Sequence, residues 1–466
     1  MSPWSLASRA WGGIALAFAL ACPAPEPVPP PDPRPSILLI TIDTLRADRL
    51  GTYGFPLDTS PQIDALAANG VVFERAIAAA TTTAPAHASI MTSRYTREHS
   101  IGFSNGATRL RNVETLAEWL REAGYATGGF VGNIMLKPRT GFRQGFEHFD
   151  SDLPDAESNR ELVFERIAGQ TTELALDWLA TTGSRPVFLW VHYQDPHGPY
   201  TPPAAHTNGL PESPDAEEET LPVLSGESGH GGIPAYQALP GLDRPSQYDR
   251  LYSGELHYAD AWIGRLLEAF DNHESGREAI VLLTADHGES LGEQDHWFAH
   301  GFSTLPFLAR VPFILRAPGI EPGRRSETVS HVDILPTLLE LANLPVPADA
   351  SGIALGPVLR GENSIPDRFV YSDIGRELTA YRGEKLIRIT GTESAWLPAN
   401  SEEVDADQIW FHYDWPRAGD VKTRPEGDDR PEAVVEYIQG AVPMSKTPAM
   451  ELDQIEQLRA LGYTVD

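Results

Sequence analysis

Short, continuous apolar runs alternate along the chain with stretches of helical periodicity. Runs rich in β-branched and aromatic side chains cover residues 37–42, 186–191 and 279–284. Such runs are typical of strands that are buried on both faces of a parallel sheet. Shorter strands are expected at 71–73, 125–131 and 311–316. Apolar residues repeated every three or four positions predict helices at 61–69, 85–92, 113–123, 174–179, 248–270 and 333–341.

This alternation predicts an α/β fold, in which a mostly parallel central sheet is sandwiched by helices. We expect this fold to occupy residues 36–347. Residues 207–245 are rich in Gly, Pro and Glu without periodicity, which indicates a long loop rather than a second core. A smaller C-terminal α+β subdomain over residues 348–466 is predicted from short strands at 369–371, 378–381 and 385–389 and helices at 432–438 and 450–461.

The first 35 residues have the composition of a targeting segment followed by a tether. Arg9 precedes an apolar run, 11–21, that is too short to span a bilayer but suits the core of a signal peptide. The tetrapeptide that ends at Cys22 resembles a bacterial lipobox, which predicts export and a lipid anchor in the cell envelope. A cleaved secretory signal, giving a periplasmic or secreted protein, is the alternative. We assign 1–21 to a signal peptide and the proline-rich residues 22–35 to a semi-rigid tether.

Composition and charge narrow the class of partner. The 466 residues include 65 acidic side chains and 36 Lys or Arg, which gives a formal net charge of −29. A field of that sign repels phosphates, so nucleic acid is excluded as a partner and an anionic substrate needs local positive charge. A bound metal ion can supply that charge. The single cysteine excludes an intramolecular disulfide.

The stretch 81–92, Thr-Thr-Thr-Ala-Pro-Ala-His-Ala-Ser-Ile-Met-Thr, is the strongest candidate for chemistry. Pro85 suits the first turn of a helix, so Thr83 lies at the N-terminus, where backbone N–H groups and the helix dipole favour an anion. His87 follows one turn later. A metal-activated hydroxyl nucleophile needs such an arrangement. The alternative is structural: the threonines cap the helix and His87 packs on its face.

Candidate metal ligands occur where two of the buried strands end. Asp43 ends the first run, and Asp286 and His287 follow the run 279–284. Because ligands bind at the carboxyl ends of strands in open α/β sheets, these side chains are better candidates than residues in mid-loop. Carboxylate oxygen and imidazole nitrogen are compatible donors for one divalent metal. For Asp43 a solvated strand end or a turn cap is the alternative.

Several segments, in the same order, resemble the sulfatase family of the alkaline-phosphatase superfamily. They are Ile42-Asp43-Thr44-Leu45-Arg46-Ala47-Asp48, Thr83-Ala84-Pro85-Ala86-His87-Ala88-Ser89, Asp195-Pro196-His197, and Thr284-Ala285-Asp286-His287-Gly288-Glu289 followed by His300-Gly301. The resemblance covers roughly residues 36–344. It implies an alkaline-phosphatase-like fold for the domain 36–347, and an enzyme that hydrolyses phosphoric or sulfuric esters there.

The sequence departs from the family pattern at positions that decide the chemistry. The usual sulfatases convert a Cys or Ser to formylglycine at the position that Thr83 holds here, and threonine cannot become that aldehyde hydrate. His87 stands at the family's arginine, and His300 at its later active-site lysine. Superfamily phosphodiesterases and phosphoryl transferases that use an unmodified threonine are therefore the closer analogy.

The motifs and the resemblance together predict a metal-dependent mechanism. Asp43, Asp286 and His287 are expected to bind one divalent metal, which also coordinates the Thr83 hydroxyl. Thr83 then attacks phosphorus or sulfur and forms a covalent ester that water later releases. With mixed oxygen and nitrogen donors, zinc, manganese and calcium are all options. The resemblance favours zinc or manganese, because His287 stands where calcium-binding sulfatases commonly have Asn.

Histidines complete the predicted site. His87, His197 and His300, at matched family positions, are expected to hydrogen-bond the transferring group or to protonate the leaving group, and His192 is a weaker candidate. The predicted substrate is a small-molecule or glycan ester of phosphate or phosphonate. One alternative is a sulfuric ester hydrolase without formylglycine. The other is a transferase that passes a phospho-group to a cell-envelope glycan.

Overall fold

The computed structural model describes residue 1 and residues 34–439, except for 100, 102–109, 111–112, 158, 212–217, 275–277, 391–408 and 415–430. The described residues from 34 onward belong to one compact unit. The proposed signal peptide, Cys22, the tether up to residue 33 and the predicted helix 450–461 lie outside the described residues.

A nine-stranded sheet forms the centre of the molecule. Its strands are β1 (Ile37–Ile42), β2 (Val71–Ile77), β3 (Ala126–Val131), β4 (His148–Asp150), β7 (Val187–Tyr193), β8 (Ile280–Ala285), β11 (Arg310–Val311), β12 (Phe313–Arg316) and β13 (Gly323–Ser330). The order is β11-β2-β12-β8-β1-β7-β3-β4, with β13 paired to β2. The five strands from β8 to β4 are parallel, and β12 runs antiparallel to β8. The prediction of a mostly parallel sheet is confirmed.

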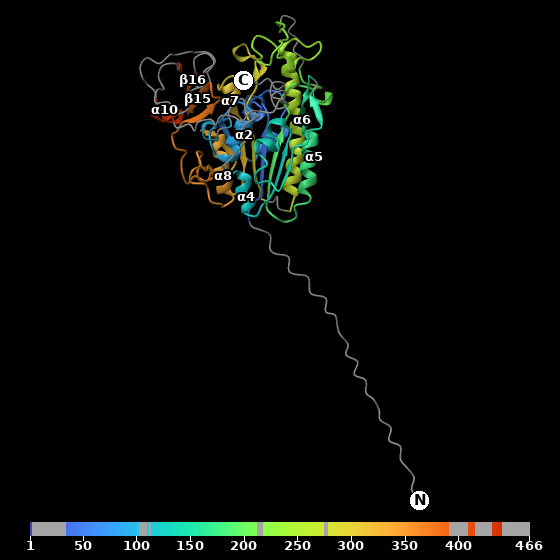
Figure 1. Cartoon of the computed structure of the whole chain (residues 1–466), viewed down its shortest axis with the longest axis vertical. Helices are drawn as coiled ribbons and strands as arrows, with labels where there is room; N and C mark the ends of the chain where they lie inside the picture. The colour runs from blue at the N-terminus through green and yellow to red at the C-terminus, as the bar shows by residue number, and fades with distance from the viewer. Residues whose placement is uncertain are drawn as a thin grey trace. The chain divides into compact units, whose positions relative to one another are not determined.

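Helices cover both faces of this sheet, as expected. The longer helices are α1 (Pro61–Ala68), α2 (Thr83–Thr92), α4 (Leu116–Glu122), α5 (Ala168–Leu179), α6 (Pro245–Asn272) and α8 (Ile334–Leu341). Shorter ones are α3 (Thr96–His99), α7 (Pro306–Ala309) and α9 (Gly356–Leu359). Figure 1 shows α5 and α6 along one side of the sheet and α2, α4 and α8 along the other. Because both faces are covered, every residue of β1 and β8 is buried.

Local sequence explains where these helices start and stop. Both α1 and α6 begin with a proline in the first turn, where its missing N–H costs nothing. Thr115 and Glu118 form a capping box at the start of α4. Ser93 ends α2 in a left-handed conformation, with φ 55°. These local signals set the residues at which the helices begin and end.

Two sequence predictions need correction. The run 311–316 is not one strand, because Pro312 has no N–H to donate and separates β11 from β12. The strand predicted to end before His192 continues to Tyr193, so His192 lies inside β7, in register with Thr41 of β1. The polar residues at the end of this strand therefore begin later than expected.

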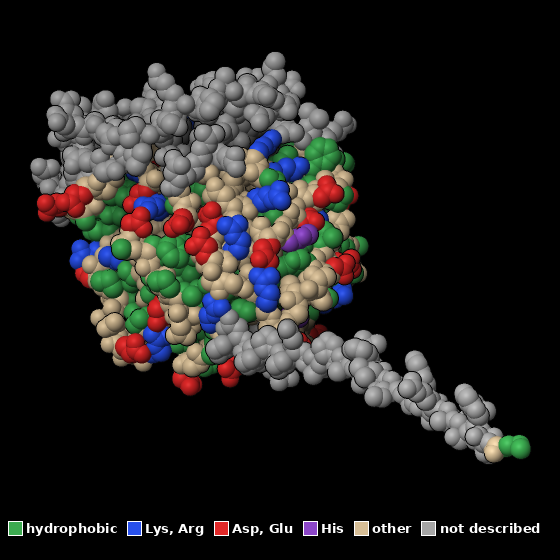
Figure 2. Space-filling model, turned by 60° about the horizontal axis from the view of Figure 1, so that its bottom comes forward, with side chains coloured by type: hydrophobic (Ala, Val, Ile, Leu, Met, Phe, Trp, Pro, Cys, Tyr) green, Lys and Arg blue, Asp and Glu red, His purple; other side chains and the backbone are tan. Residues whose placement is uncertain are grey.

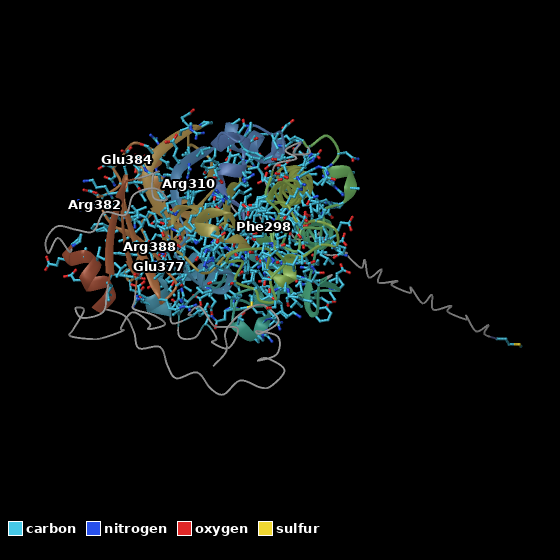
Figure 3. The ribbon with its side chains drawn as sticks, turned by 90° about the horizontal axis from the view of Figure 1, so that it is seen from above. Phe298, Arg310, Glu377, Arg382, Glu384 and Arg388 are labelled. Carbon is cyan, nitrogen blue, oxygen red and sulfur yellow. The ribbon has the colours of Figure 1, made fainter. Side chains whose placement is uncertain are left out.

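The C-terminal region contains the predicted smaller sheet. Four antiparallel strands follow one another: β14 (Val370–Asp373), β15 (Glu377–Arg382), β16 (Lys385–Thr390) and β17 (Ile409–Asp414), with α10 (Glu432–Gln439) after them. Figure 3 labels Glu377 and Arg388 on adjacent strands, and they form an ion pair of 2.5 Å. The other carboxylate oxygen of Glu377 accepts from Ser303 Oγ at 2.8 Å and Thr304 N at 2.7 Å. This sheet is thus attached to the loop that follows His300.

Two short hairpins lie outside the two larger sheets. They are β5 (Asp155–Glu157) with β6 (Arg160–Glu165), and β9 (Ser290–Leu291) with β10 (Trp297–Ala299). Figure 2 shows one face of the molecule, on which acidic and basic side chains are interspersed among apolar ones. Within the described part of the chain, no helix is both long enough and apolar enough to cross a membrane.

Candidate metal centre and active site

Three neighbouring parallel strands, β8, β1 and β7, bring the predicted ligands to one edge of the sheet. Asp43 follows β1 directly, and its N–H donates to Tyr193 O on β7 at 2.9 Å. Asp286 follows β8, and its N–H donates to Ile42 O on β1 at 3.3 Å. These backbone bonds continue the sheet ladder past the strand ends. They hold both aspartates at the edge where the sequence predicted a ligand site.

Asp43, Asp286 and His287 form a buried cluster of facing ligand atoms. His287 Nε2 lies 3.8 Å from Asp43 Oδ1 and 3.6 Å from Asp286 Oδ2. All three side chains are completely buried. None of these three atoms has a hydrogen-bond partner among the described residues. Unpaired carboxylate oxygens in a protein interior are costly unless a cation balances them. The three residues therefore fit a divalent metal ion.

The remaining atoms of the three side chains are held by hydrogen bonds. Asp43 Oδ2 accepts from Asn133 Nδ2 at 2.7 Å. Asp286 Oδ1 accepts from the backbone N–H of His287 at 2.7 Å and of Thr44 at 3.2 Å. His287 Nδ1 lies 3.0 Å from Gly288 O. Each side chain is thus fixed on one side and presents its free atom on the other, as supporting hydrogen bonds do in metal sites.

Burial sets the protonation of this cluster. It raises the pKa of Asp286 to about 8 and, together with the nearby Asp286 charge, that of Asp43 well above its usual value. Burial lowers the pKa of His287 to about 4, which keeps the ring neutral at pH 7. A neutral imidazole is the form that binds metal, and a bound cation would favour both ionised carboxylates.

Thr83 begins α2 and is connected to this cluster through His87. The side chain of Thr83 is buried, at 1% exposure. Thr82, the N-cap residue, makes no side-chain cap within the described structure. His87 Nδ1 lies 2.8 Å from Thr83 O and 3.7 Å from Asp286 Oδ2. The start of α2, where the helix dipole and unbonded N–H groups attract anions, therefore lies beside the ligand cluster.

His87 itself is turned into the protein. Besides its contact with Thr83, its Nε2 lies 3.0 Å from Thr41 Oγ1 on β1. Its ring stacks on that of His192, with 4.8 Å between the ring centres. Because both ring nitrogens of His87 have partners inside the protein, the geometry favours a role in positioning α2 over contact with the substrate.

Of the other two predicted histidines, His300 lies next to His287, and His197 lies next to His300. The ring centre of His300 is 4.6 Å from that of His287 and 5.2 Å from that of His197. His300 Nδ1 lies 3.1 Å from Glu289 Oε1. Burial and the charge of Arg160 lower the pKa of His300 to about 3. The His300 ring is therefore neutral, and its Nε2 takes no part in the contact with Glu289.

Two polar residues of the site were not identified from the sequence. Asn133 follows β3, one strand beyond β7, and the strand-end argument that identified Asp43 would also have found it. Glu289 is completely buried, and its second oxygen accepts from Tyr200 OH at 3.1 Å. It lies three residues after Asp286, inside the motif 284–289 that resembles the sulfatase family. Nothing else in the sequence marks this glutamate as a residue of the site.

The described part of the loop 207–245 packs against a cluster of aromatic side chains. Ile233 from this loop is buried with four aromatic side chains: Tyr200, Tyr248, Tyr252 and Phe298. Figure 3 labels Phe298 of β10. Tyr252 OH donates to Thr44 O at 2.9 Å and accepts from Arg46 N at 3.1 Å. Ile233 thus joins the loop to this cluster, and Tyr252 of α6 supports the turn that follows Asp43.

Comparison with known proteins gives a matching family model and curated relatives. The family model described as Sulfatase matches residues 35–344. Iduronate 2-sulfatase of Homo sapiens is 27% identical over an alignment of 393 residues, and the match covers 67% of this chain and 70% of that protein.

Solved structures share the fold. The phosphonate monoester hydrolase of Silicibacter pomeroyi superposes with a TM-score of 0.64 at 21% identity, over 83% of this chain and 90% of that one. A protein solved with its substrate D-glucosamine-2-N,6-O-disulfate gives a TM-score of 0.63 at 21% identity, over 82% of this chain and 91% of that one. The proteins similar to this chain therefore include those named for sulfate esters and for phosphonate esters.

Proposed function

The chain belongs to the sulfatase family, and from that premise we propose that it is a metal-dependent hydrolase that cleaves phosphate or phosphonate esters with Thr83 as the nucleophile. Hydrolysis of an ester bond is what the family and its relatives have in common. The observation that carries the proposal is the position of Thr83. It begins α2 and is linked through His87 to Asp286, whose free carboxylate oxygen faces His287.

The proposed metal would be held by Asp43, Asp286 and His287, as their free ligand atoms suggest. A divalent cation there supplies positive charge that acidifies a nearby hydroxyl and neutralises the oxygens of an anionic ester. Asn133 and the N–H groups of Thr44 and His287 keep the carboxylates oriented. The first N–H groups of α2 offer further hydrogen bonds to the ester oxygens.

The reaction uses Thr83 twice. Its Oγ gives up a proton, attacks phosphorus and forms an O–P bond, while the bond to the leaving alcohol breaks. Water then attacks the same phosphorus, so that phosphate or phosphonate is released and the threonine hydroxyl is restored. We assign to His300, whose Nδ1 contacts Glu289, and to His197 beside it the roles of accepting the first proton and delivering one to the leaving oxygen.

The residues at two positions favour phosphorus over sulfur. Threonine at position 83 cannot form the aldehyde hydrate that the usual sulfatases use. Position 87, the family's arginine, holds a histidine whose nitrogens face Thr83 O and Thr41 Oγ1. Both departures support the proposal of an unmodified threonine alkoxide as the nucleophile. Sulfate ester hydrolysis by the same threonine is the second candidate, because the human relative is named a sulfatase.

The deciding experiment compares matched aryl esters. Sulfate, phosphate monoester, phosphate diester and phosphonate monoester are hydrolysed by the metal-reconstituted full chain, by Thr83→Ala and by Thr83→Ser. We expect the phosphorus esters to react faster, Thr83→Ala to lose turnover, and Thr83→Ser to keep part of it together with a covalent phospho-enzyme detectable by mass spectrometry. Faster sulfate cleavage that disappears in Thr83→Ala would establish the second candidate instead.

Substrate class and location extend the proposal. The neighbour that was solved with a sulfated glucosamine supports a small-molecule or glycan ester as substrate.

Export with a lipid anchor at Cys22 is proposed from the sequence pattern of residues 11–22. Replacement Cys22→Ser should release the protein from the membrane fraction. Unchanged membrane association of that variant would contradict the anchor.

A further inference from the structure

We propose that Glu377 of the C-terminal sheet is a positioning residue for the reaction, which holds the segment before Thr83 and the loop after His300 in place. The inference rests on the proposed function, because it concerns the roles assigned to those two residues. Glu377 begins β15 and is buried. It lies beyond residues 35–344, which the family model matches. The catalytic domain expected from the sequence, 36–347, would therefore lack one of its supports.

The carboxylate of Glu377 is directed at two consecutive residues of that loop. Its Oε1 accepts from Ser303 Oγ at 2.8 Å, from Thr304 N at 2.7 Å and from Thr304 Oγ1 at 3.0 Å. Its Oε2 forms the ion pair with Arg388 at 2.5 Å. Hydrogen bonds to an ionised acceptor are stronger than those between neutral groups. Arg388 thus balances the charge, while the other oxygen orients the loop.

The pleat of β15 adds two further contacts with the same loop. Side chains at alternate positions of a strand share a face, and Thr379 and Tyr381 follow Glu377 at that spacing. Thr379 Oγ1 lies 2.7 Å from Thr304 Oγ1, and Tyr381 OH donates to Thr304 O. Thr304 is completely buried. One face of the strand therefore contacts Thr304 through its backbone groups and through its hydroxyl.

The loop connects both sides of the proposed reaction site. Ser303 comes three residues after His300. Its carbonyl oxygen accepts from Thr81 Oγ1 at 2.8 Å, and Thr81 comes two residues before Thr83. Thr81 and Ser303 are both buried, so neither contact has water to replace it. A displacement of Ser303 would therefore move the His300 loop and the start of α2 together, and about 1 Å of misplacement can cost about 100-fold in rate.

A purely structural role for Glu377 is the alternative, because every buried carboxylate needs partners. Apolar side chains often stabilise an interior as well as a buried ion pair does. This sheet already has such contacts, since Val370 and Leu386 are buried with Ile77 and Leu305. Hydrogen bonds of defined direction to the loop add orientation, which apolar contacts do not supply. The arrangement therefore favours positioning over stability alone.

Steady-state kinetics of the metal-loaded full chain, on the aryl ester that it hydrolyses fastest, test the proposal. In Glu377→Leu we expect kcat to fall about 10- to 100-fold, with KM and metal content as in the wild type. Glu377→Gln should keep most of the activity, because its amide oxygen can accept from Ser303 and Thr304. Asp373→Leu is the matched control. Asp373 is also a buried acid of this sheet, but it pairs with Arg97 of α3 at 2.5 Å. This variant should lose stability without losing kcat.

Hydrogen exchange followed by mass spectrometry gives a readout that needs no turnover. Because Thr304 N–H donates to Glu377, the peptide 300–305 should exchange faster in Glu377→Leu. The peptide 80–86 should also exchange faster, because Thr81 contacts Ser303. In Asp373→Leu both peptides should exchange as they do in the wild type.

Three results would overturn the proposal: wild-type kcat in Glu377→Leu, an equal loss of kcat in Asp373→Leu, or unchanged exchange of the peptide 80–86 in Glu377→Leu. If Glu377→Leu fails to fold, Ser303→Ala decides. It removes one donor to Glu377 and should lower kcat, so wild-type kcat in that variant would also defeat the proposal. If the wild type cleaves no ester, the proposed function fails, and the exchange of the two peptides alone decides whether Glu377 holds them.

Discussion

Two histidine pairs lie at the site, and they differ in exposure and in partners. His87 and His192 stack almost parallel, at 13°, and both are completely buried. His197 and His300 meet at 62°, and the His300 side chain keeps 12% of its surface exposed. The inner pair, His87 and His192, faces Asp43 and Asp286. In the outer pair, His197 and His300, the His300 ring contacts Glu289. The difference teaches that position, not residue type, decides whether a histidine of this site is enclosed by the protein or keeps contact with solvent.

Loss of a carboxylate next to the inner pair should have the largest effect. Asp286→Asn removes a charged ligand, so we expect metal content to fall and activity to drop by about a thousandfold or more. Metal analysis and turnover of an aryl phosphodiester measure the two effects together. Asp260→Asn is the control, because Asp260 is also buried but bonds to Gln62 N and Ile63 N at the start of α1. Full activity of Asp286→Asn with unchanged metal would refute the ligand set.

Removal of the outer imidazole should separate chemistry from metal binding. In His300→Gln we expect kcat to fall by about 10²–10⁴-fold, the usual contribution of a general acid or base, while the metal stays bound. The exposed His230, replaced by Gln, provides a control with no change. Metal loss in His300→Gln would mean that the two pairs are not functionally distinct.

Glu289 is expected to affect catalysis only by orienting His300, so its replacement should lower kcat less than replacement of His300 does. Glu289→Gln keeps the size of the side chain but weakens the contact at 3.1 Å with His300 Nδ1. We expect kcat to fall by about tenfold, as for loss of a supporting hydrogen bond. The double variant with His300→Gln should be no worse than His300→Gln itself. Additive losses in this double-mutant cycle would show that Glu289 acts independently.

Metal removal should lower stability modestly and change its dependence on pH. A metal present at about 100 times its dissociation constant stabilises the fold by about 2.7 kcal/mol, and chelation removes that stabilisation. Burial raises the pKa of Asp286 and of Glu289 to about 8, above the value near 4 in an unfolded chain. Between these values the folded, stripped protein binds more protons than the unfolded chain does, so its stability should fall as pH rises from about 4 to about 8.

Thermal unfolding with and without chelator, at several pH values, measures both effects. The metal-loaded protein should lose less stability over the same pH range, because the cation favours the ionised carboxylates. Parallel pH profiles with and without chelator would argue that no cation balances this cluster.

Sequence reasoning found the parts of the site that follow from strand ends. Asp43, Asp286 and His287 were expected at the carboxyl ends of buried strands, and they meet there. Thr83 was expected at a helix N-terminus, and α2 begins at this residue. These predictions succeeded because runs of buried apolar residues and a proline in a first helical turn are local signals.

The parts that were missed depend on register and packing. His192 was a weaker candidate because its side chain could alternate into the core. It does lie inside β7 and is buried, but its ring comes within 3.6 Å of Asp43. The inward turn of His87 depends on Thr41 of a strand far away in the sequence. Glu289 depends on where Tyr200 and His300 come to lie. None of these contacts has a periodic signature, so the sequence could not rank these residues.

The attachment of the C-terminal sheet to the loop after His300 has a practical consequence for protein engineering. Val370, Tyr381 and Leu386 of that sheet are buried together with Ile77 and Leu305 of the main unit. A chain cut after residue 347 would expose this apolar surface and leave Ser303 and Thr304 without the carboxylate of Glu377. The truncated protein should therefore aggregate and lose the geometry around His300. The two sheets should melt as one cooperative unit, and expression boundaries belong after the second sheet rather than between them.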